Sequence, residues 1–65
     1  MISYKPLWKL LIEKDLKKLE FAALCSISTA TLAKLSKNDF VSMDVLCKIC
    51  SALDCQFGDI VEYQK

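Results

Sequence analysis

The chain has 65 residues, of which 54% are hydrophobic and 26% are charged, and its formal net charge is +1. This composition is too apolar for a disordered segment, and a single Gly and a single Pro are too few turn residues for a many-stranded β fold. No apolar run reaches the roughly 18 to 20 residues that span a bilayer and no export signal is recognisable, so we expect one cytoplasmic domain over residues 1–65.

The first helical pattern starts at Pro6. Proline suits the first turn of a helix, because the N–H group that it lacks would be unpaired there. Apolar residues follow at helical spacing, and the pattern predicts a helix over residues 6–14. The residues on its apolar face are Leu7, Trp8, Leu10, Leu11 and Ile12.

A second and shorter helix is predicted over residues 18–25, after a link formed by Asp15 and Leu16. Its inward positions follow the spacing i, i+1 and i+4. They are occupied by Phe21, Ala22 and Cys25. The helix is therefore only two turns long.

Ser28 marks the start of a third helix, because its hydroxyl can accept a hydrogen bond from the free N–H groups of a first turn. This helix is predicted over residues 29–36, with Leu32 and Leu35 facing inward. Its outward face is small and polar, with one long cation at its centre. Residues 36–39 are predicted to form a turn, since Asn and Asp tolerate a left-handed backbone.

Ser42 is a second helix cap, and Asp44 lies favourably near the positive end of the helix dipole. A long amphipathic helix is predicted over residues 43–53, and we expect it to be the central packing element. Its apolar positions are Val45, Leu46, Ile49, Cys50 and Leu53. Residues 56–63 have too few apolar side chains to decide between a last short helix, which we favour, and an extended arm.

Charge is divided unevenly along the chain. Residues 1–38 carry seven lysines and three acids, a balance of +4, whereas residues 39–65 carry two lysines and five acids, a balance of −3. A chain divided in this way can present one basic face to a polyanion. Ordinary solvated surface is the alternative explanation.

The second and third helices together form a recognisable arrangement. When two short helices are separated by three or four turn residues, and the second is capped and bears small polar residues, the second can enter the major groove of DNA. The chain resembles the lambda-repressor and Cro-like helix-turn-helix domains of the Xre family, with the motif at about residues 18–36. The resemblance implies a compact all-α bundle of four to five short helices. It also implies a transcriptional regulator, a repressor, that binds double-stranded DNA in a sequence-specific way.

The resemblance rests on individual residues of this sequence. Ala22 is the small residue that lets the two helices of the motif approach, and Ser28 fits the cap before the recognition helix. The stretch SISTATLAKLSKND is similar to the stretch with which the family reads DNA. The other core positions of the motif are occupied by Phe21, Ile27, Leu32 and Leu35.

The chain also departs from the family pattern. Lys17 stands where the family usually has a Ser or Thr cap, and Lys18 where it has Gln or a similar phosphate contact. Ser26 replaces a turn glycine, so we expect a left-handed backbone there at a cost of about 1 kcal/mol. Three positions that the family tends to keep polar form an apolar strip on the second helix. They are Leu19, Ala23 and Leu24.

The resemblance implies a division of roles within the motif, whose DNA-binding residues include the cap Ser28. Thr29 can hydrogen-bond a base edge or a phosphate, Ala30 offers a methyl group to thymine, and Lys34 can reach guanine O6 and N7. Contacts to phosphate set the register without discriminating bases. These contacts are assigned to Lys18, Thr31, Lys37 and Asn38.

Dimerisation is expected from the small number of cations. A monomer would contact only a handful of phosphates, so its affinity would be modest and would fall steeply with salt. We therefore expect a homodimer at least on DNA, with two copies about 34 Å apart on a palindrome. The candidate dimer surfaces are the apolar strip and a tail surface of Phe57, Ile60, Val61 and Tyr63. In the alternative, the tail folds onto the first and fourth helices.

Four cysteines raise the question of a zinc or redox site, but without an export signal we expect free thiols. Cys47 and Cys50 lie within one predicted helix, whereas structural zinc sites of this spacing usually use turns. Cys25 and Cys50 take core positions, where a free thiol acts as a small hydrophobic group, and Cys55 lies beyond the helix. We expect no metal and no small-molecule cofactor.

An enzyme is not expected, because the chain has no His, no glycine-rich phosphate loop and no paired carboxylates. The competing function is a protein–protein interaction module on the same scaffold, such as an antitoxin or an anti-repressor. That module would use the apolar strip and the acidic C-terminal half, and nothing in the residues excludes it. A DNA-binding protein should shift a duplex in a salt-dependent and sequence-dependent way, which a protein-only module would not.

Overall fold

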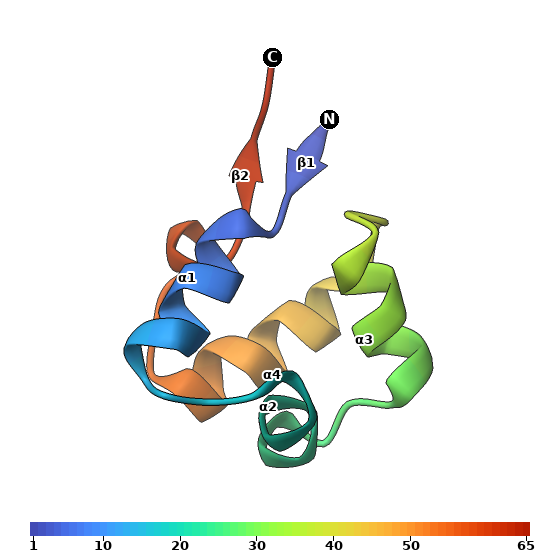
Figure 1. Ribbon diagram of the computed structural model, residues 1–65. Coiled ribbons are helices and arrows are strands. Elements are labelled where there is room, and N and C mark those ends of the chain that lie inside the picture. The colour runs from blue at the N-terminus through green and yellow to red at the C-terminus, as the bar shows by residue number, and fades with distance from the viewer.

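Helices make up most of the molecule. The computed structural model describes all 65 residues, and the predicted all-α bundle of four to five short helices is confirmed (Figure 1). The predicted bounds of the second, third and fourth helices are confirmed at both ends. None of these helices has both the length and the apolar character needed to cross a membrane. In chain order the elements are β1 (Ile2–Ser3), α1 (Lys5–Glu13), α2 (Lys18–Cys25), α3 (Thr29–Ser36), α4 (Met43–Leu53), the 3₁₀ helix η1 (Phe57–Asp59) and β2 (Glu62–Tyr63).

α1 begins one residue earlier than predicted, at Lys5, and ends one residue earlier, at Glu13. Pro6 stands within its first turn, where the lack of an N–H group is harmless. The helix buries Leu7 and Leu11, and the chain then reverses at Asp15, whose φ is 56°. This reversal carries the chain from α1 to the start of α2.

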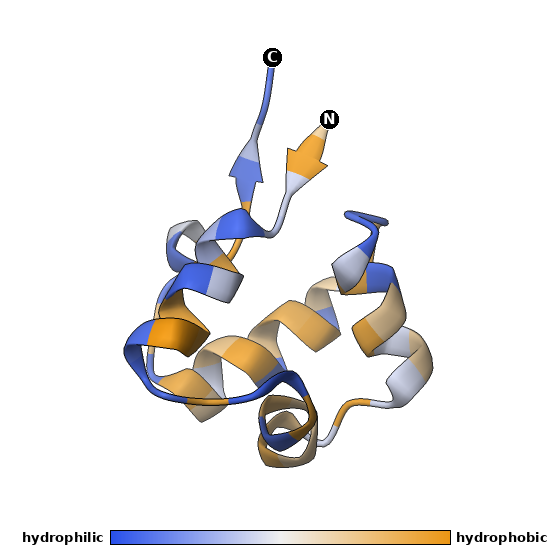
Figure 2. Ribbon diagram, viewed as in Figure 1, coloured by the Kyte–Doolittle hydropathy of each residue, from blue (hydrophilic) through white to orange (hydrophobic).

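α4 lies at the centre of the packing, as predicted. Ser42 caps it, because the Ser42 hydroxyl accepts a hydrogen bond from the Val45 N–H at 3.2 Å. Figure 2 shows α4 largely in apolar colours, and its residues Ile49 and Leu53 are buried in the core. The core cluster takes side chains from all four α-helices and from both ends of the chain, so that α2 and α3 are fixed against the rest. Its members are Tyr4, Leu7, Leu11, Phe21, Ala22, Cys25, Leu32, Leu35, Ile49, Leu53 and Ile60.

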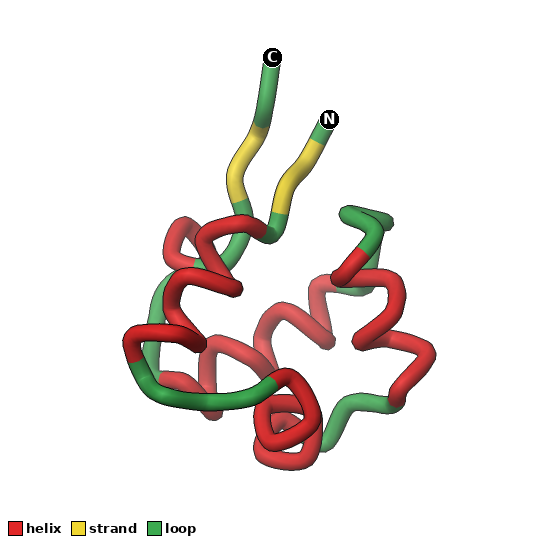
Figure 3. Tube along the Cα trace, in the orientation of Figure 1, coloured by secondary structure: helices red, strands yellow, loops and turns green.

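The tail contains both of the structures considered for it. η1 is a single 3₁₀ turn that packs against α1 and α4, and the segment after it is extended. There β2 pairs antiparallel with β1, with Ile2 opposite Tyr63 and Ser3 opposite Glu62 (Figure 3). Strands this short are not predicted by the sequence, because two residues carry no measurable alternation. Ile60 is buried in the core, so it does not contribute to the dimer surface considered for the tail.

Candidate nucleic-acid interface

The outer face of α3 is uncovered. In Figure 1 this helix lies at one edge of the molecule, with no other element outside it. Leu32 and Leu35 point into the core, as predicted, and all other residues of the helix except the half-buried Thr31 are exposed. The exposed positions are Thr29, Ala30, Ala33, Lys34 and Ser36. The helix therefore offers a continuous accessible face of small and polar side chains with one long cation.

The start of α3 is fixed by Ser28. Its hydroxyl oxygen accepts a hydrogen bond from the Thr31 N–H at 3.1 Å, and its hydroxyl lies 3.1 Å from Thr31 Oγ1. The predicted cap is thus confirmed, and Thr31 is turned back toward it. Because both side chains bond to each other, Ser28 and Thr31 hold the first turn in place, and the free N–H groups beside them face outward from the helix end.

The turn between α2 and α3 uses the left-handed backbone predicted at Ser26, which has φ 57° and ψ 41°. The Ile27 N–H donates to the Ala22 carbonyl at 3.0 Å, and the Ile27 side chain packs against the core. Ala22 is buried where α2 approaches α3, which agrees with its assignment as the small residue of the motif. The turn therefore sets the angle at which α3 leaves α2.

The end of α3 is tied to the N-terminus of the chain through Asn38. Asn38 has φ 60°, and its Oδ1 accepts a hydrogen bond from the Tyr4 N–H at 3.0 Å. The buried Tyr4 hydroxyl donates to the Asp39 carbonyl at 2.7 Å. Asn38 therefore has a structural bond that the sequence did not suggest, and its Nδ2 group remains available as a donor.

Lys18, the first residue of α2, lies against an aromatic ring. Its Nζ is 4.4 Å from the centroid of the Trp8 ring, which in turn meets Phe21 edge-on at a centroid distance of 6.4 Å. Phe21 is completely buried. The ammonium group predicted to contact phosphate is thus held by a cation–π contact that reaches down to the core.

The cations of the motif are accessible. Lys34 is exposed in the last turn of α3, and Lys37 is exposed at its C-cap, where cations also interact favourably with the helix dipole. Asp39 and Asp44 follow in the link to α4 and in its first turn. The cations assigned to the interface thus lie at the start of α2, in α3 and at its C-cap, and two acids follow them along the chain.

Sequence reasoning missed three residues of this region. Ala33 is exposed one helical turn after Thr29 and shares its face, which the helical spacing alone could have indicated. Tyr4 and Trp8 act through contacts with residues far away in the chain. Because those contacts depend on how α1 packs, no local sequence pattern predicts them.

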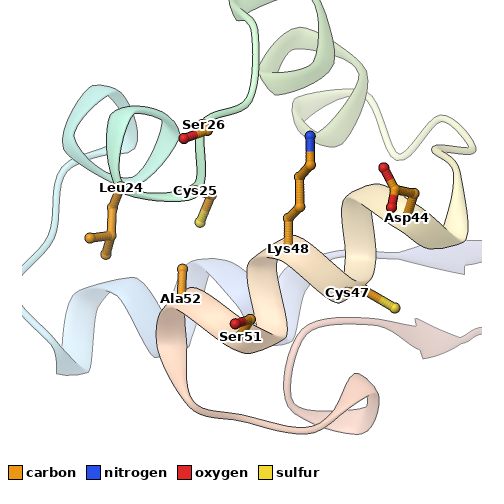
Figure 4. Close-up of a pocket in the computed structure, with 8 residues that line it drawn as sticks. All are labelled: Leu24, Cys25, Ser26, Asp44, Cys47, Lys48, Ser51 and Ala52. Carbon is orange, nitrogen blue, oxygen red and sulfur yellow. The ribbon is translucent and has the colours of Figure 1, made fainter.

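An open groove of about 540 Å³ separates the C-terminal end of α2 from α4 (Figure 4). Leu24 and Cys25 point from α2 toward α4, and Ala52 points back toward them. Lys48 projects farther along α4. The groove is lined at one end by Ser26 of the turn between α2 and α3, and its other lining residues belong to α2 and α4.

The four cysteines are free thiols. Cys25 is buried, which raises the pKa of its thiol. Burial, together with the neighbouring Cys50, raises the pKa of the Cys55 thiol to about 11. No group of three or more His, Cys, Asp or Glu side chains is placed to hold a metal ion. Thiols with raised pKa values are poor nucleophiles at neutral pH, and Cys47 is the exposed one.

Residues 6–65 match the family model of the Cro/C1-type helix-turn-helix (HTH) DNA-binding domain. Among solved structures, the chain is similar to the crystal structure of the transcriptional regulator VanUg, with a TM-score of 0.91 and 52% sequence identity. That match covers 94% of this chain and 81% of the other chain. The comparison with curated proteins gives no match. The family match includes α2, the turn and α3, and hence every residue of the candidate interface.

Proposed function

Because the chain belongs to the Cro/C1-type helix-turn-helix DNA-binding domain family, we propose that it is a sequence-specific transcriptional regulator whose helix α3 reads the major groove. The observation that carries this proposal is the uncovered outer face of α3, capped at its start by Ser28. An α-helix with small side chains on one face fits the width of the major groove, about 12 Å. The function requires no catalytic group.

Three exposed residues of α3 are proposed to read bases. Thr29 donates or accepts a hydrogen bond at a base edge, and Ala30 contacts the methyl group of thymine. Lys34 stands one helical turn beyond Ala30, so both face the same stretch of the groove, and Lys34 donates to guanine O6 and N7. Their exposure supports these roles.

The phosphate contacts are proposed to flank this reading face. Lys18 approaches one side of the groove from the start of α2, and Lys37 and Asn38 approach from the end of α3. Thr31 and Ser28 contribute chiefly through the N–H groups that their mutual cap leaves at the start of α3. Such contacts fix the position of the protein on the duplex and give the binding its salt dependence.

We further propose that two copies bind one palindromic site and repress by occupying it. The longest dimension of the molecule is 30 Å, which is close to the roughly 34 Å between successive major grooves on one side of the duplex. Two copies side by side therefore reach both half-sites. Native mass spectrometry of the complex should give two chains per duplex, and one chain on a complete palindrome would contradict the dimer.

Selection of duplexes from a random pool tests the function directly. The bound fraction should converge on a shared sequence, and the affinity for that sequence should fall by orders of magnitude as salt rises from about 50 to 200 mM. Scrambled duplexes of equal length serve as the control. Binding that ignores sequence, or a pool that does not converge, would contradict the proposal.

The competing function, an interaction module, is supported by a specific observation. Leu19 and Leu24 on α2 are 71% and 54% exposed, an apolar surface that DNA does not need. A protein that used only this surface would fail the duplex selection. It would also lose its protein partner when Leu19 and Leu24 are replaced by Glu.

A further inference from the structure

Trp8 holds Lys18 in one place. The Lys18 ammonium lies over the face of the Trp8 ring, 4.4 Å from its centroid. The ring itself is half-buried and meets the fully buried Phe21 edge-on, with an angle of 84° between the two planes. A continuous path of contact therefore leads from the core through the indole to a charged group at the surface.

This contact changes what the lysine can do. A free lysine side chain samples many rotamers and gives up that freedom when it binds a phosphate. A ring beneath the ammonium restricts these rotamers in advance, and the N–H groups on the side away from the ring stay available to an acceptor. Trp8 therefore prepares Lys18 for binding rather than hiding it.

The position of the lysine strengthens this effect. Lys18 is the first residue of α2, and the N-cap residue Lys17 gives this helix no side-chain cap. Glu20 accepts a hydrogen bond from the Lys17 N–H at 3.0 Å, but the N–H groups of the first turn remain free. The ammonium thus stands beside unpaired backbone donors.

We propose that Trp8 is a positioning residue for DNA binding, which holds the Lys18 ammonium ready at the start of α2 for a DNA phosphate. This inference rests on the proposed function and adds a residue of α1 to it. Trp8 does not contact the duplex itself. It raises the affinity equally for every sequence, because it acts through a contact to phosphate.

A double-mutant cycle on DNA affinity tests the inference. Trp8→Leu should weaken binding about two- to fivefold on specific and unrelated duplexes alike, the range expected from the loss of an exposed cation–π contact. Trp8→Phe, which keeps a ring but a weaker one, should lose less. In the Lys18→Ala background, Trp8→Leu should change the affinity no further. Binding is measured well below the melting temperature of each variant.

Lys48→Ala is the matched control, because Lys48 is an exposed lysine of α4 that is assigned no DNA contact, and the Trp8 ring makes its cation–π contact with Lys18. Trp8→Leu should weaken this variant as much as it weakens the wild type. The inference is overturned if the Trp8 and Lys18 effects simply add, if Trp8→Leu leaves binding unchanged, or if it tightens binding. If the wild-type protein binds no duplex, both the proposed function and this inference are wrong. If it binds DNA but the Trp8 and Lys18 substitutions show no coupling, only this inference is wrong.

Discussion

Four residues carry the chain through a left-handed backbone, and none of them is glycine. Asp15, Ser26, Asn38 and Asp54 have φ values between 52° and 60°, and each follows the end of a helix. Asp and Asn tolerate this region because their short side chains bond locally to the backbone. The Ser26 hydroxyl makes such local hydrogen bonds more weakly. Among the four helix ends, backbone strain is therefore greatest in the turn that orients α3.

Replacing Ser26 by glycine should therefore stabilise the protein. Glycine adopts φ 57° without a Cβ penalty, and we expect a gain of about 1 kcal/mol, reduced by the greater freedom of glycine in the unfolded chain. Urea unfolding followed by circular dichroism measures this change in the free energy of unfolding. Ser26→Ala, which keeps the Cβ, should give no gain. A stability of Ser26→Gly at or below that of Ser26→Ala would show that the turn is not strained.

The helices differ in how well their starts are capped. Ser28 and Ser42 cap α3 and α4 through side-chain hydrogen bonds, at 3.1 and 3.2 Å. The N-cap residue of α2, Lys17, has an extended backbone and supplies no side-chain cap. These caps also explain the sequence predictions, because a cap followed by apolar residues at helical spacing is a local signal. The bounds of α3 and α4 could be predicted for that reason.

The remaining features depend on contacts between distant parts of the chain. Tyr4 and Asn38 are 34 residues apart, and their hydrogen bond arises only once α1 has packed beside the end of α3. The cation–π contact of Lys18 likewise depends on the position of α1. The exposed face of α3 could be predicted from helical spacing alone, whereas the contacts that hold Lys18 and Asn38 could not.

A cap introduced at the start of α2 should stabilise the fold. Lys17→Ser supplies a hydroxyl to the free N–H groups of the first turn, and a good N-cap contributes about 1 kcal/mol. For a chain of this size, that gain raises the melting temperature by about 4–8 °C. Lys17→Ala removes the same charge without adding a cap, so it should not reproduce the gain. Equal melting temperatures for the two variants would contradict the capping argument.

At the scale of the whole molecule, the stability of the fold depends on ionisable groups that are buried in their neutral, protonated form. Burial raises the pKa of Tyr4 near the N-terminus and of Cys25 at the end of α2. It also raises the pKa of Cys55 after α4, from 9.0 to about 11. Each group keeps its proton to a higher pH in the folded protein than in the unfolded chain, so its ionisation lowers the free energy of unfolding.

The fold should therefore lose stability in alkaline solution. The folded protein keeps the Cys55 proton at a pH where the unfolded chain releases it, so this contribution is fully present below about pH 9 and is lost as the pH rises through about 11. Urea unfolding at pH 8, 9, 10 and 11 measures the decline, which should be smaller in Cys55→Ala. A free energy of unfolding that stays constant or rises over this range would contradict the assignment.

The claim on which the account depends is that α3 reads bases while the start of α2 contacts phosphate. The most direct measurement compares wild type, Lys34→Ala and Lys18→Ala on the selected duplex and on each of its single-base variants. Lys34→Ala should lose about 1–3 kcal/mol on the selected duplex and discriminate less at one base position. Lys18→Ala should lose affinity by the same factor on every duplex. If Lys34→Ala keeps the full base preference, or Lys18→Ala is the variant that relaxes it, α3 does not read the operator.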